Sequence, residues 1–310
     1  MARDSQPGAL RQIWRAVRQL NPGRAARESR RPFMLALVAT SDEAAAAMRE
    51  FLLGPSPPQH GVARADQVLG AYIQPLGRAE RGALEKADFI LAAEGAADGL
   101  ERDLFSFESE RPERSLAVIL TGRRGKELRL SLARHLPAFR TEAARQIVRE
   151  VSRENAIFVI ATALGNVVPS VLQPLIGAAE AAGDIVFLTA NQIRMLFAIG
   201  AAYGADVGYL AQWREISSIV GAAFGWRSLA RNLVSKLPFG AGLVPKGAVA
   251  YAGTAVMGEG LIFYYSTGRR MTRQEIRQAF RRAYSEAVAI ARSLVGKLRP
   301  EAPDDGLVQD

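Results

Sequence analysis

The sequence contains no cysteine, which excludes disulfide bonds, thiolate zinc sites, iron–sulfur clusters and thiol catalysis. Its only histidines are His60 and His135, so a metal centre with several histidine ligands is excluded as well. The mean hydropathy of +0.01 is high for a soluble protein but too low for a polytopic transporter. With 310 residues, of which 49% are apolar and 23% charged, the chain has a globular composition and the length of two domains.

Sequence motifs of common enzyme classes are also missing. No G-x-S-x-G, H-E-x-x-H or G-x-G-x-x-G occurs, and the segment Thr40–Met48 lacks the glycines and the lysine of a phosphate-binding loop. Asp42 and Glu43 stand where phosphates would lie and would repel a triphosphate, whereas they suit the first turn of a helix. We therefore predict a protein that is not an enzyme and that holds no cofactor and no metal.

A weaker candidate for anion binding is the turn at Thr121–Lys126. The turn is basic, contains glycine and precedes a predicted helix, so its backbone N–H groups could hold an anion. A solvated turn is the alternative, because Glu127 stands where a Mg²⁺-binding hydroxyl would be needed. The candidate anion-binding residues are Gly122, Gly125 and Lys126.

The net charge of +9 is concentrated at the two ends of the chain. Residues 1–31 carry +6 and residues 269–310 carry +3, while residues 32–153 and 154–268 are each neutral. A nucleic-acid-binding domain would usually carry a basic face on its folded body. Basic ends around a neutral, apolar middle are more typical of contact with anionic lipid headgroups. We therefore predict anionic membrane lipids, and not nucleic acid, as a partner.

The N-terminal basic segment contains an amphipathic helix, predicted over residues 8–20, with one apolar stripe opposite a row of arginines. Tryptophan beside arginine is typical of a helix that lies in a membrane surface, although the same stripe could pack on the protein's own core. The sequence Asn21-Pro22-Gly23 ends this helix, and residues 24–31 are predicted to form a basic linker. The predicted membrane-surface residues of this segment are Arg11, Trp14, Arg15 and Arg18.

The C-terminal basic segment contains a second amphipathic helix, predicted over residues 269–299. A capping box, Thr272-Arg-Gln-Glu275, marks its start, and residues 300–310 are predicted to form a disordered tail. Its predicted membrane-surface residues are Arg273, Arg277 and Arg281.

Residues 32–139 alternate between apolar strand runs and helical segments. Continuous apolar strands separated by helices favour a parallel sheet that is covered on both faces. We therefore predict a small, doubly wound α/β domain. Its predicted strands are Phe33–Ala39, Ala71–Gln74, Asp88–Ala93 and Ser115–Leu120.

Residues 140–268 are predicted to form an all-α domain rich in alanine and glycine, whose small side chains permit close helix packing. Only 11 of the 114 residues in 155–268 are charged. The uncharged run Ala156–Ala179 is long enough to span a bilayer, but its prolines favour two short helices around a bend. A further break is predicted at Pro245.

A polar cluster interrupts this apolar region. Buried polar groups need partners, so we expect the cluster to pair internally or with an acid such as Asp184 or Asp206. A structural network is the first interpretation, and a ligand or proton pathway is the alternative. The predicted members of the network are Asp184, Asn191, Gln192 and Arg194.

The run Asp184–Gly204, together with Glu215–Gly221 and Arg227–Gly258, resembles the YcjF-like bacterial domain of unknown function over about residues 140–268. Members of that family are often attached to, or encoded beside, small GTPases of the Era type and are usually taken to be membrane-associated. The resemblance therefore implies a helical module at the membrane and a small GTPase or another protein as a partner. It brings no active site to carry over.

The resemblance also implies that residues 32–139 are a GTPase-like domain that has lost its motifs. Where such a domain has its phosphate loop, this chain has Thr40–Met48. Where the Asp-x-x-Gly and guanine-reading motifs would stand, it has Gln74–Gly77 and Thr121–Arg124. These three departures argue against GTP hydrolysis.

Three functional hypotheses follow. The first is a non-catalytic protein on the cytoplasmic side of the bacterial inner membrane, with its helical domain in or on that membrane and its α/β domain as a partner-binding surface. The second is a soluble two-domain interaction protein. The third is a GTPase-related protein with residual nucleotide binding.

Overall fold

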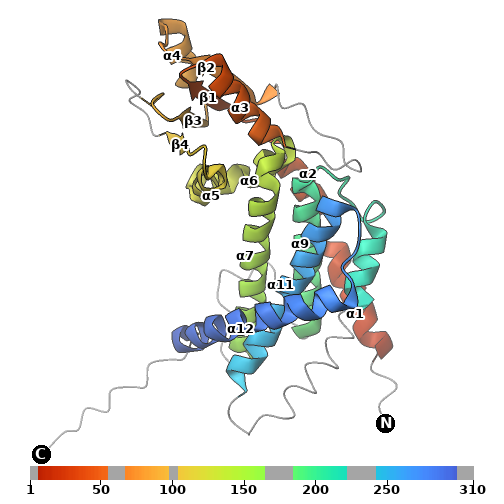
Figure 1. The fold of residues 1–310 in the computed structure, drawn as a ribbon. Coiled ribbons are helices and arrows are strands. Elements are labelled where there is room, and N and C mark those ends of the chain that lie inside the picture. Colours follow the sequence, from red (N-terminus) through yellow and green to blue (C-terminus); the bar gives the residue numbers. More distant parts are fainter. Residues whose placement is uncertain (1–5, 55–66, 98–103, 165–183, 222–241, 299–310) are drawn as a thin grey trace, which may run out of the picture.

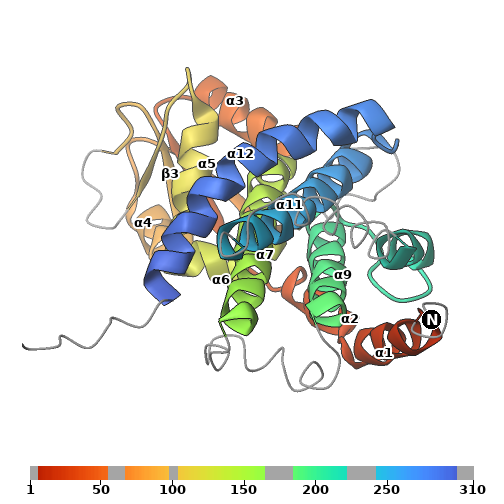
Figure 2. The same cartoon turned by 90° about the horizontal axis from the view of Figure 1, so that it is seen from below.

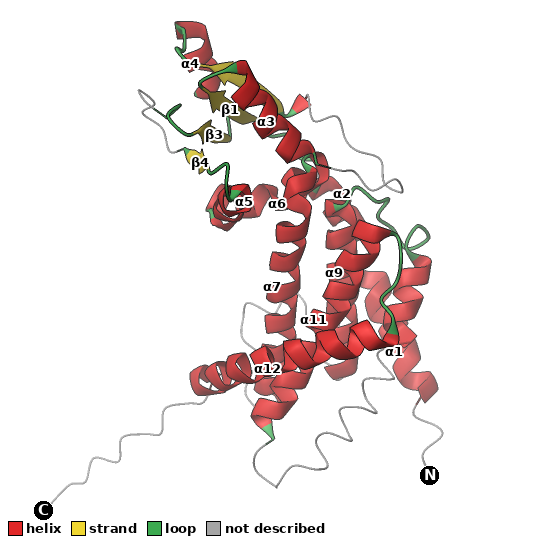
Figure 3. Ribbon diagram, in the orientation of Figure 1, coloured by secondary structure: helices red, strands yellow, loops and turns green. Residues whose placement is uncertain are grey.

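The structure is a computed structural model that combines a small parallel sheet with a larger set of helices, so the expectation of an α/β part and a helical part is confirmed. The strands and the helices beside them gather at one end of the molecule, and the long helices form the other end (Figures 1 and 3). The structure describes residues 6–54, 67–97, 104–164, 184–221 and 242–298.

The sheet has four parallel strands in the order β2-β1-β3-β4. Strand β1 is central and buried along its whole length, with Leu35 aligned to Leu69 on β2 and to Phe89 on β3. This order is that of a doubly wound sheet, in which ligands commonly bind at the carboxyl ends of the strands where the order reverses. The strands are β1 (Leu35–Ala39), β2 (Leu69–Ile73), β3 (Phe89–Ala93) and β4 (Phe105–Phe107).

Helices cover both faces of this sheet, as predicted. Leu35 and Leu37 point into the main core with α3 and α5, whereas Ala36 and Val38 point to a smaller cluster that includes Leu84 of α4. This division follows from the alternation of side chains along a strand. The covering helices are α3 (Asp42–Leu53), α4 (Arg78–Leu84) and α5 (Pro112–Thr121). We call these helices and the four strands the sheet unit.

The predicted fourth strand, Ser115–Leu120, is wrong, because these residues lie in α5. Pro112 starts this helix, and its fixed φ and missing N–H suit the first helical turn. Short apolar runs do not distinguish a strand from a helix, and here Leu116, Ile119 and Leu120 share a buried helical face. The fourth strand is β4 instead, and the Ser115 hydroxyl donates a hydrogen bond to the Ser106 carbonyl on it.

The long helices form a bundle in which α7 packs on α9 and α11, and α12 packs on α11. Close packing depends on glycine, because a Cβ on Gly247 would lie 2.6 Å from Ile160 Cδ1 and one on Gly258 would lie 2.3 Å from Val148 Cγ2. The predicted close approach through small residues is thus confirmed. The bundle comprises α6 (Arg123–His135), α7 (Arg140–Ala163), α9 (Asp184–Ala202), α11 (Leu243–Thr267) and α12 (Arg273–Leu298), with a short 3-10 turn η2 (Pro137–Phe139) before α7.

The N-terminal segment forms two helices, α1 (Gln6–Gln19) and α2 (Pro22–Glu28), and both pack on α9. The predicted helix and its end before Pro22 are confirmed. The predicted linker over residues 24–31 is wrong for its first part, which belongs to α2. Ser29 is buried just beyond the helix, and its hydroxyl donates to the Ala26 carbonyl at 3.0 Å.

One predicted interruption of the helical region, at Pro245, is absent, and the predicted bend in the uncharged run lies outside the described residues. The first part of the uncharged run, up to Ala163, continues α7, and residues 165–179 lie outside the described part of the chain. Pro245 lies in the first turn of α11, where a proline removes only an N–H that has no partner within the helix. The predicted capping box is confirmed, since Thr272 N donates to Glu275 Oε2 at 2.7 Å and Glu275 N donates to Thr272 Oγ1 at 3.2 Å. Residues 300–310 are outside the described ranges.

Candidate functional site

The apolar stripe of α1 faces the protein's own core. Ile13 and Val17 are completely buried, and the helix contacts α9. Of the two arrangements expected for this helix, the structure therefore has the one in which it docks on the bundle. The stripe itself is not free to enter a membrane while α1 stays docked.

A second apolar feature lies along one flank of α1. Trp14 is half-buried and stacks on Trp213, with the ring centroids 5.2 Å apart and an angle of 20° between the planes. Trp213 is 53% exposed, Leu210 is 93% exposed and Leu10, one turn before Trp14, is 39% exposed. We call Leu10, Trp14, Leu210 and Trp213 the tryptophan patch. Large apolar side chains that gather in the open commonly mark an interaction surface.

The turn that carries Leu210 is fixed to α1. The Tyr209 hydroxyl donates to the Val17 carbonyl at 2.7 Å and also contacts the Leu20 carbonyl, so it caps the last turn of α1. On the other side of the turn, Gln212 Nε2 donates to the Tyr265 hydroxyl at 2.7 Å. These hydrogen bonds hold the two tryptophans together, although residues 14 and 213 are far apart in the sequence.

Arginines border the tryptophan patch. Because successive residues of a helix are about 100° apart, Arg11 and Arg18 lie next to Trp14 on α1, and Arg15 lies one step farther round. All three are exposed, as predicted, and none of them forms a side-chain ion pair with another residue that the structure describes. The arrangement therefore presents apolar side chains and uncompensated positive charge on the same side of α1.

The arginines of α12 form a separate group. Arg273, Arg277 and Arg281 are exposed and spaced by four residues, so they follow one side of the helix, beside the stacked rings of Phe280 and Tyr284 at 5.8 Å. Seen along the bundle, α1 and α12 lie on opposite sides of α9 and α11 (Figure 2). The structure therefore does not bring the two predicted groups of membrane-surface arginines together.

The candidate anion-binding turn has a structural explanation. Gly122 separates α5 from α6, and Gly125 is buried within α6, where a Cβ would lie 1.7 Å from the Ile119 carbonyl oxygen. Glycine at position 125 is thus needed for close packing of the two helices. Lys126 is exposed. Helix packing therefore accounts for Gly125 without an anion, and anion binding at this turn stays a prediction.

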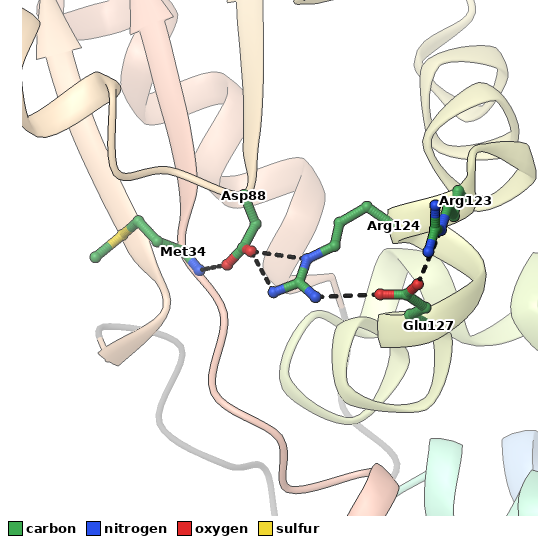
Figure 4. Close-up of polar contacts among 5 residues, drawn as sticks. All are labelled: Met34, Asp88, Arg123, Arg124 and Glu127. Atoms are coloured by element: carbon green, nitrogen blue, oxygen red, sulfur yellow. Dashed lines mark hydrogen bonds and ion pairs between the residues drawn. The ribbon is translucent and has the colours of Figure 1, made fainter.

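The arginines of the same turn are paired with acids (Figure 4). Arg124 donates from Nε and Nη2 to Asp88 Oδ1 at 2.9 and 2.6 Å and from Nη1 to Glu127 Oε2 at 3.2 Å, and Arg123 donates from Nε to Glu127 Oε1 at 3.4 Å. The pairing with Asp88 raises the pKa of Arg124 above its ordinary value. Because Asp88 Oδ2 also accepts from Met34 N at 2.9 Å, this cluster fastens α6 to the start of the sheet.

The carboxyl ends of β1 and β3, where doubly wound proteins often bind ligands, are occupied by the chain's own groups. Ser41 caps α3 by accepting from Ala44 N at 3.2 Å, and a backbone N–H, together with the smaller effect of the Ser41 side chain, holds the pKa of Glu43 below its ordinary value. Gln74 Nε2 donates across this edge to the Ala96 carbonyl at 3.1 Å. Acids at the helix start thus take the place that a phosphate would need.

The predicted polar cluster forms a buried network between α7, α9 and α11. Asn191 Nδ2 donates to Asn155 Oδ1 at 2.8 Å, and Asn155 Nδ2 donates to Thr254 Oγ1 at 2.8 Å. Gln192 Nε2 donates to the same hydroxyl at 3.3 Å, and the hydroxyl donates in turn to the Ala250 carbonyl at 2.9 Å. The network links three helices that would otherwise meet only through apolar side chains.

The acid of this network is Glu154. Its Oε2 accepts from Arg194 and, at 3.1 Å, from Asn191. The expectation of Asp206 as the partner is wrong, because Asp206 is exposed and lies beyond the end of α9; the side chain of Asp184 is outside the described residues. The sequence did not identify three members of the network, Glu154, Asn155 and Thr254. Only the packing of α7 and α11 on α9 shows that these residues lie near Asn191.

The network predicts a specific loss of stability. Asn155→Ala should lower the free energy of unfolding by about 2 to 3 kcal/mol, because it leaves the buried amide of Asn191 and the hydroxyl of Thr254 short of a partner. Urea denaturation measures the change. The exposed Ser285, whose hydroxyl donates only to the Arg282 carbonyl, is the control, and Ser285→Ala should stay within about 0.5 kcal/mol. Equal stability of Asn155→Ala and the parent protein would show that the network contributes nothing.

The described residues contain no group of three or more histidine, aspartate or glutamate side chains placed to hold a metal ion. One helical stretch of the described chain, Ile185–Ala202 in α9, is long and apolar enough to cross a membrane, with a mean hydropathy of 1.5. However, 72% of this stretch is buried inside the protein, as in the core helix of a soluble protein.

No protein-family model, curated protein or solved structure matches this chain. The resemblance to the YcjF-like family stays a prediction.

Proposed function

We propose that this is a non-catalytic protein that attaches peripherally to an anionic membrane surface through the tryptophan patch and the arginines of α1. The observation that carries the proposal is the coincidence on one side of the molecule of the 93% exposed Leu210, the 53% exposed Trp213 and unpaired arginines. Exposed apolar side chains beside positive charge are what an anionic headgroup layer attracts.

The two kinds of side chain contribute differently to such attachment. Each arginine near an anionic surface contributes about 1 kcal/mol, mainly by attraction over a Debye length. Tryptophan suits the interface because its ring is apolar and its N–H can reach water or headgroups. Leu210 adds an apolar side chain that has almost no contact with the protein itself. Attachment through this patch needs no unfolding of α1 and no exposure of α9.

The rest of the proposal concerns location and partners and is supported only by the sequence. The resemblance to the YcjF-like family favours the cytoplasmic face of the bacterial inner membrane, with a small GTPase or another protein as the partner of the sheet unit. We also propose that the sheet unit is a GTPase-like domain without nucleotide binding. The strand order β2-β1-β3-β4 is compatible with this, and the acids at the start of α3 argue against a bound triphosphate.

The alternative is a soluble two-domain interaction protein. The burial of α9 and of the apolar stripe of α1 supports this alternative. In that case the tryptophan patch would bind another protein, and lipid vesicles would leave its tryptophans unaffected.

Fluorescence quenching by lipid decides between these two functions. The chain has three tryptophans, so Trp226→Phe leaves emission from Trp14 and Trp213 alone. Vesicles of phosphatidylglycerol and phosphatidylcholine with brominated acyl chains should quench this emission, whereas brominated vesicles of phosphatidylcholine alone should not. Unquenched emission with both kinds of vesicle would refute attachment through the patch.

The same patch predicts an effect on affinity. The double substitution Leu210→Ala and Trp213→Ala should weaken vesicle binding about 10- to 100-fold, because partial insertion of each side chain contributes about half of the 1.5 to 3 kcal/mol that full burial gives. Co-sedimentation with phosphatidylglycerol vesicles measures the change. The control is Val118→Ala, which removes a 56% exposed apolar side chain from α5 in the sheet unit and should leave the affinity unchanged.

A further inference from the structure

A solvent-open hollow of about 1230 Å³, which we call the cavity, lies where the sheet unit meets the bundle. It is lined by residues of α3 and α5 on one side and by η2, the start of α7 and the ends of α9 and α11 on the other. Its volume exceeds that of many small-molecule sites, and junctions between structural units are common places for such sites. The apolar part of its lining includes Phe51, Leu53, Leu116 and Pro137.

One wall of the cavity holds a buried cation without a counter-charge. Arg140, at the start of α7, is 3% exposed and is the only charged side chain in the buried class among the described residues. Its Nε donates to the Ala133 carbonyl at 3.2 Å, while Nη1 and Nη2 have no hydrogen-bond partner in the described part of the chain. Its guanidinium lies 5.9 Å from the ring centre of Tyr203, a cation–π contact.

Tyr203 adds a second unsatisfied group to the same wall. It is 2% exposed and lines the cavity, and its hydroxyl meets no well-aligned hydrogen-bond partner within the described ranges, although the neighbouring Thr141 side chain acts to lower its pKa. Burial lowers the pKa of Arg140 and raises the pKa of Tyr203, so both side chains lack the solvation that they have in water. Buried polar groups and charges are costly without partners, and groups left unpaired beside a cavity commonly serve a ligand.

The charges around the cavity restrict what could satisfy Arg140. Glu50 and Glu113 also line it, but neither forms an ion pair with Arg140. Arg49 is the other charged residue of the lining, so apart from Arg140 the lining carries one more negative than positive charge. Such surroundings disfavour a polyanion such as a nucleoside triphosphate and tolerate a single negative charge at Arg140.

We propose that this cavity binds an organic monoanion, a carboxylate on an apolar chain, with the carboxylate at the Arg140 guanidinium and the Tyr203 hydroxyl. The guanidinium has two N–H-bearing nitrogens without acceptors, which matches the two oxygens of a carboxylate, and because both nitrogens are buried the neighbouring side chains must move aside for the carboxylate to reach them. The apolar chain lies against Phe51, Leu53 and Leu116. The proposal is independent of membrane attachment, because the cavity and the tryptophan patch share no residue.

Calorimetric titration of the full chain with decanoate, kept below its micelle concentration, tests the proposal. We expect saturable binding of one decanoate per chain, and no binding of the uncharged decanol or of GTP. Arg140→Met should weaken decanoate binding at least about 10- to 100-fold, because a hydrogen-bonded ion pair is lost. Arg153→Met, which removes an exposed arginine from the same helix, should leave the affinity unchanged.

Two further measurements keep the outcome clear. Replacing an unpaired buried charge with an apolar side chain is neutral or stabilising, so Arg140→Met should fold with an unchanged or raised melting temperature. Tyr203→Phe keeps the ring and removes only the hydroxyl, and it should weaken decanoate binding about threefold to tenfold. Absence of decanoate binding to the parent protein overturns the proposal. So does equal affinity of decanoate and decanol, or an Arg140→Met protein that folds and binds decanoate as before.

Discussion

Reversing the charge of three arginines on α1 should almost abolish binding to anionic vesicles. We expect the triple variant Arg11→Glu, Arg15→Glu and Arg18→Glu to bind phosphatidylglycerol vesicles about 100-fold more weakly than the parent protein, or worse. Each arginine near the surface contributes about 1 kcal/mol, and the new carboxylates are repelled as well. Because all three side chains are exposed and unpaired among the described residues, the fold should be unaffected. Co-sedimentation gives the affinity, and circular dichroism verifies the fold.

The matched control is the same change of charge on α12. Arg273→Glu, Arg277→Glu and Arg281→Glu together alter the net charge by the same amount, but α12, which carries them, lies on the other side of the bundle from α1 (Figure 2). If α1 carries the contact, the α12 variant should lose much less affinity, through long-range attraction alone. Equal losses for both variants would mean that net charge, and not the surface around the tryptophan patch, determines binding.

Adding one methyl group at Gly125 should be among the most damaging single substitutions in the protein. The Cβ of Gly125→Ala would lie 1.7 Å from the Ile119 carbonyl oxygen and 2.7 Å from the Ile119 carbonyl carbon. Backbone atoms cannot rotate away as a flexible side chain can, so α5 and α6 must separate. We expect a loss of about 3 kcal/mol or more in the free energy of unfolding. Urea denaturation measures this loss.

Two controls separate packing from anion binding at this turn. Gly82→Ala, within α4, meets no atom within 4 Å and should be neutral or stabilising by about 0.5 to 1 kcal/mol, because alanine favours a helix. Lys126→Ala removes the exposed cation of the candidate anion site and should change stability by less than about 0.5 kcal/mol. A stable Gly125→Ala protein would contradict the close packing of α5 on α6.

The sequence predicted those helices and strands whose ends or burial are determined by residues close together in the chain. Ser41 followed by two acids indicated the start of α3, and the Thr272–Glu275 box indicated the start of α12, because a cap is formed by residues only a few positions apart. The apolar run Phe33–Ala39 indicated a buried strand, which the structure has as β1. The same kind of run at residues 115–120 is a helix, since a short apolar segment without polar alternation fits both structures.

The candidate sites were less predictable because they join residues that are distant in the sequence. Trp14 was recognised on α1, but its stacking on Trp213 depends on the turn after α9 folding back onto α1. Arg194 forms its ion pair with Glu154 of α7. The sequence suggested acids close to α9 instead, because it does not show which side of α7 packs against α9. Nothing in the sequence distinguishes Arg140 from the other arginines of α7; only the structure shows that it is buried beside a cavity and has no acid as a partner.

Binding of the unmodified full chain to vesicles tests the central claim most directly. The account predicts co-sedimentation with vesicles that contain phosphatidylglycerol, little with vesicles of phosphatidylcholine alone, and release as the salt concentration rises from about 0.1 to 1 M, where the screening length falls from about 10 to 3 Å. Apolar contacts of the tryptophan patch should retain a residual fraction at high salt. A protein that stays in the supernatant with both kinds of vesicle at low salt would contradict membrane attachment and leave the soluble interaction protein as the function.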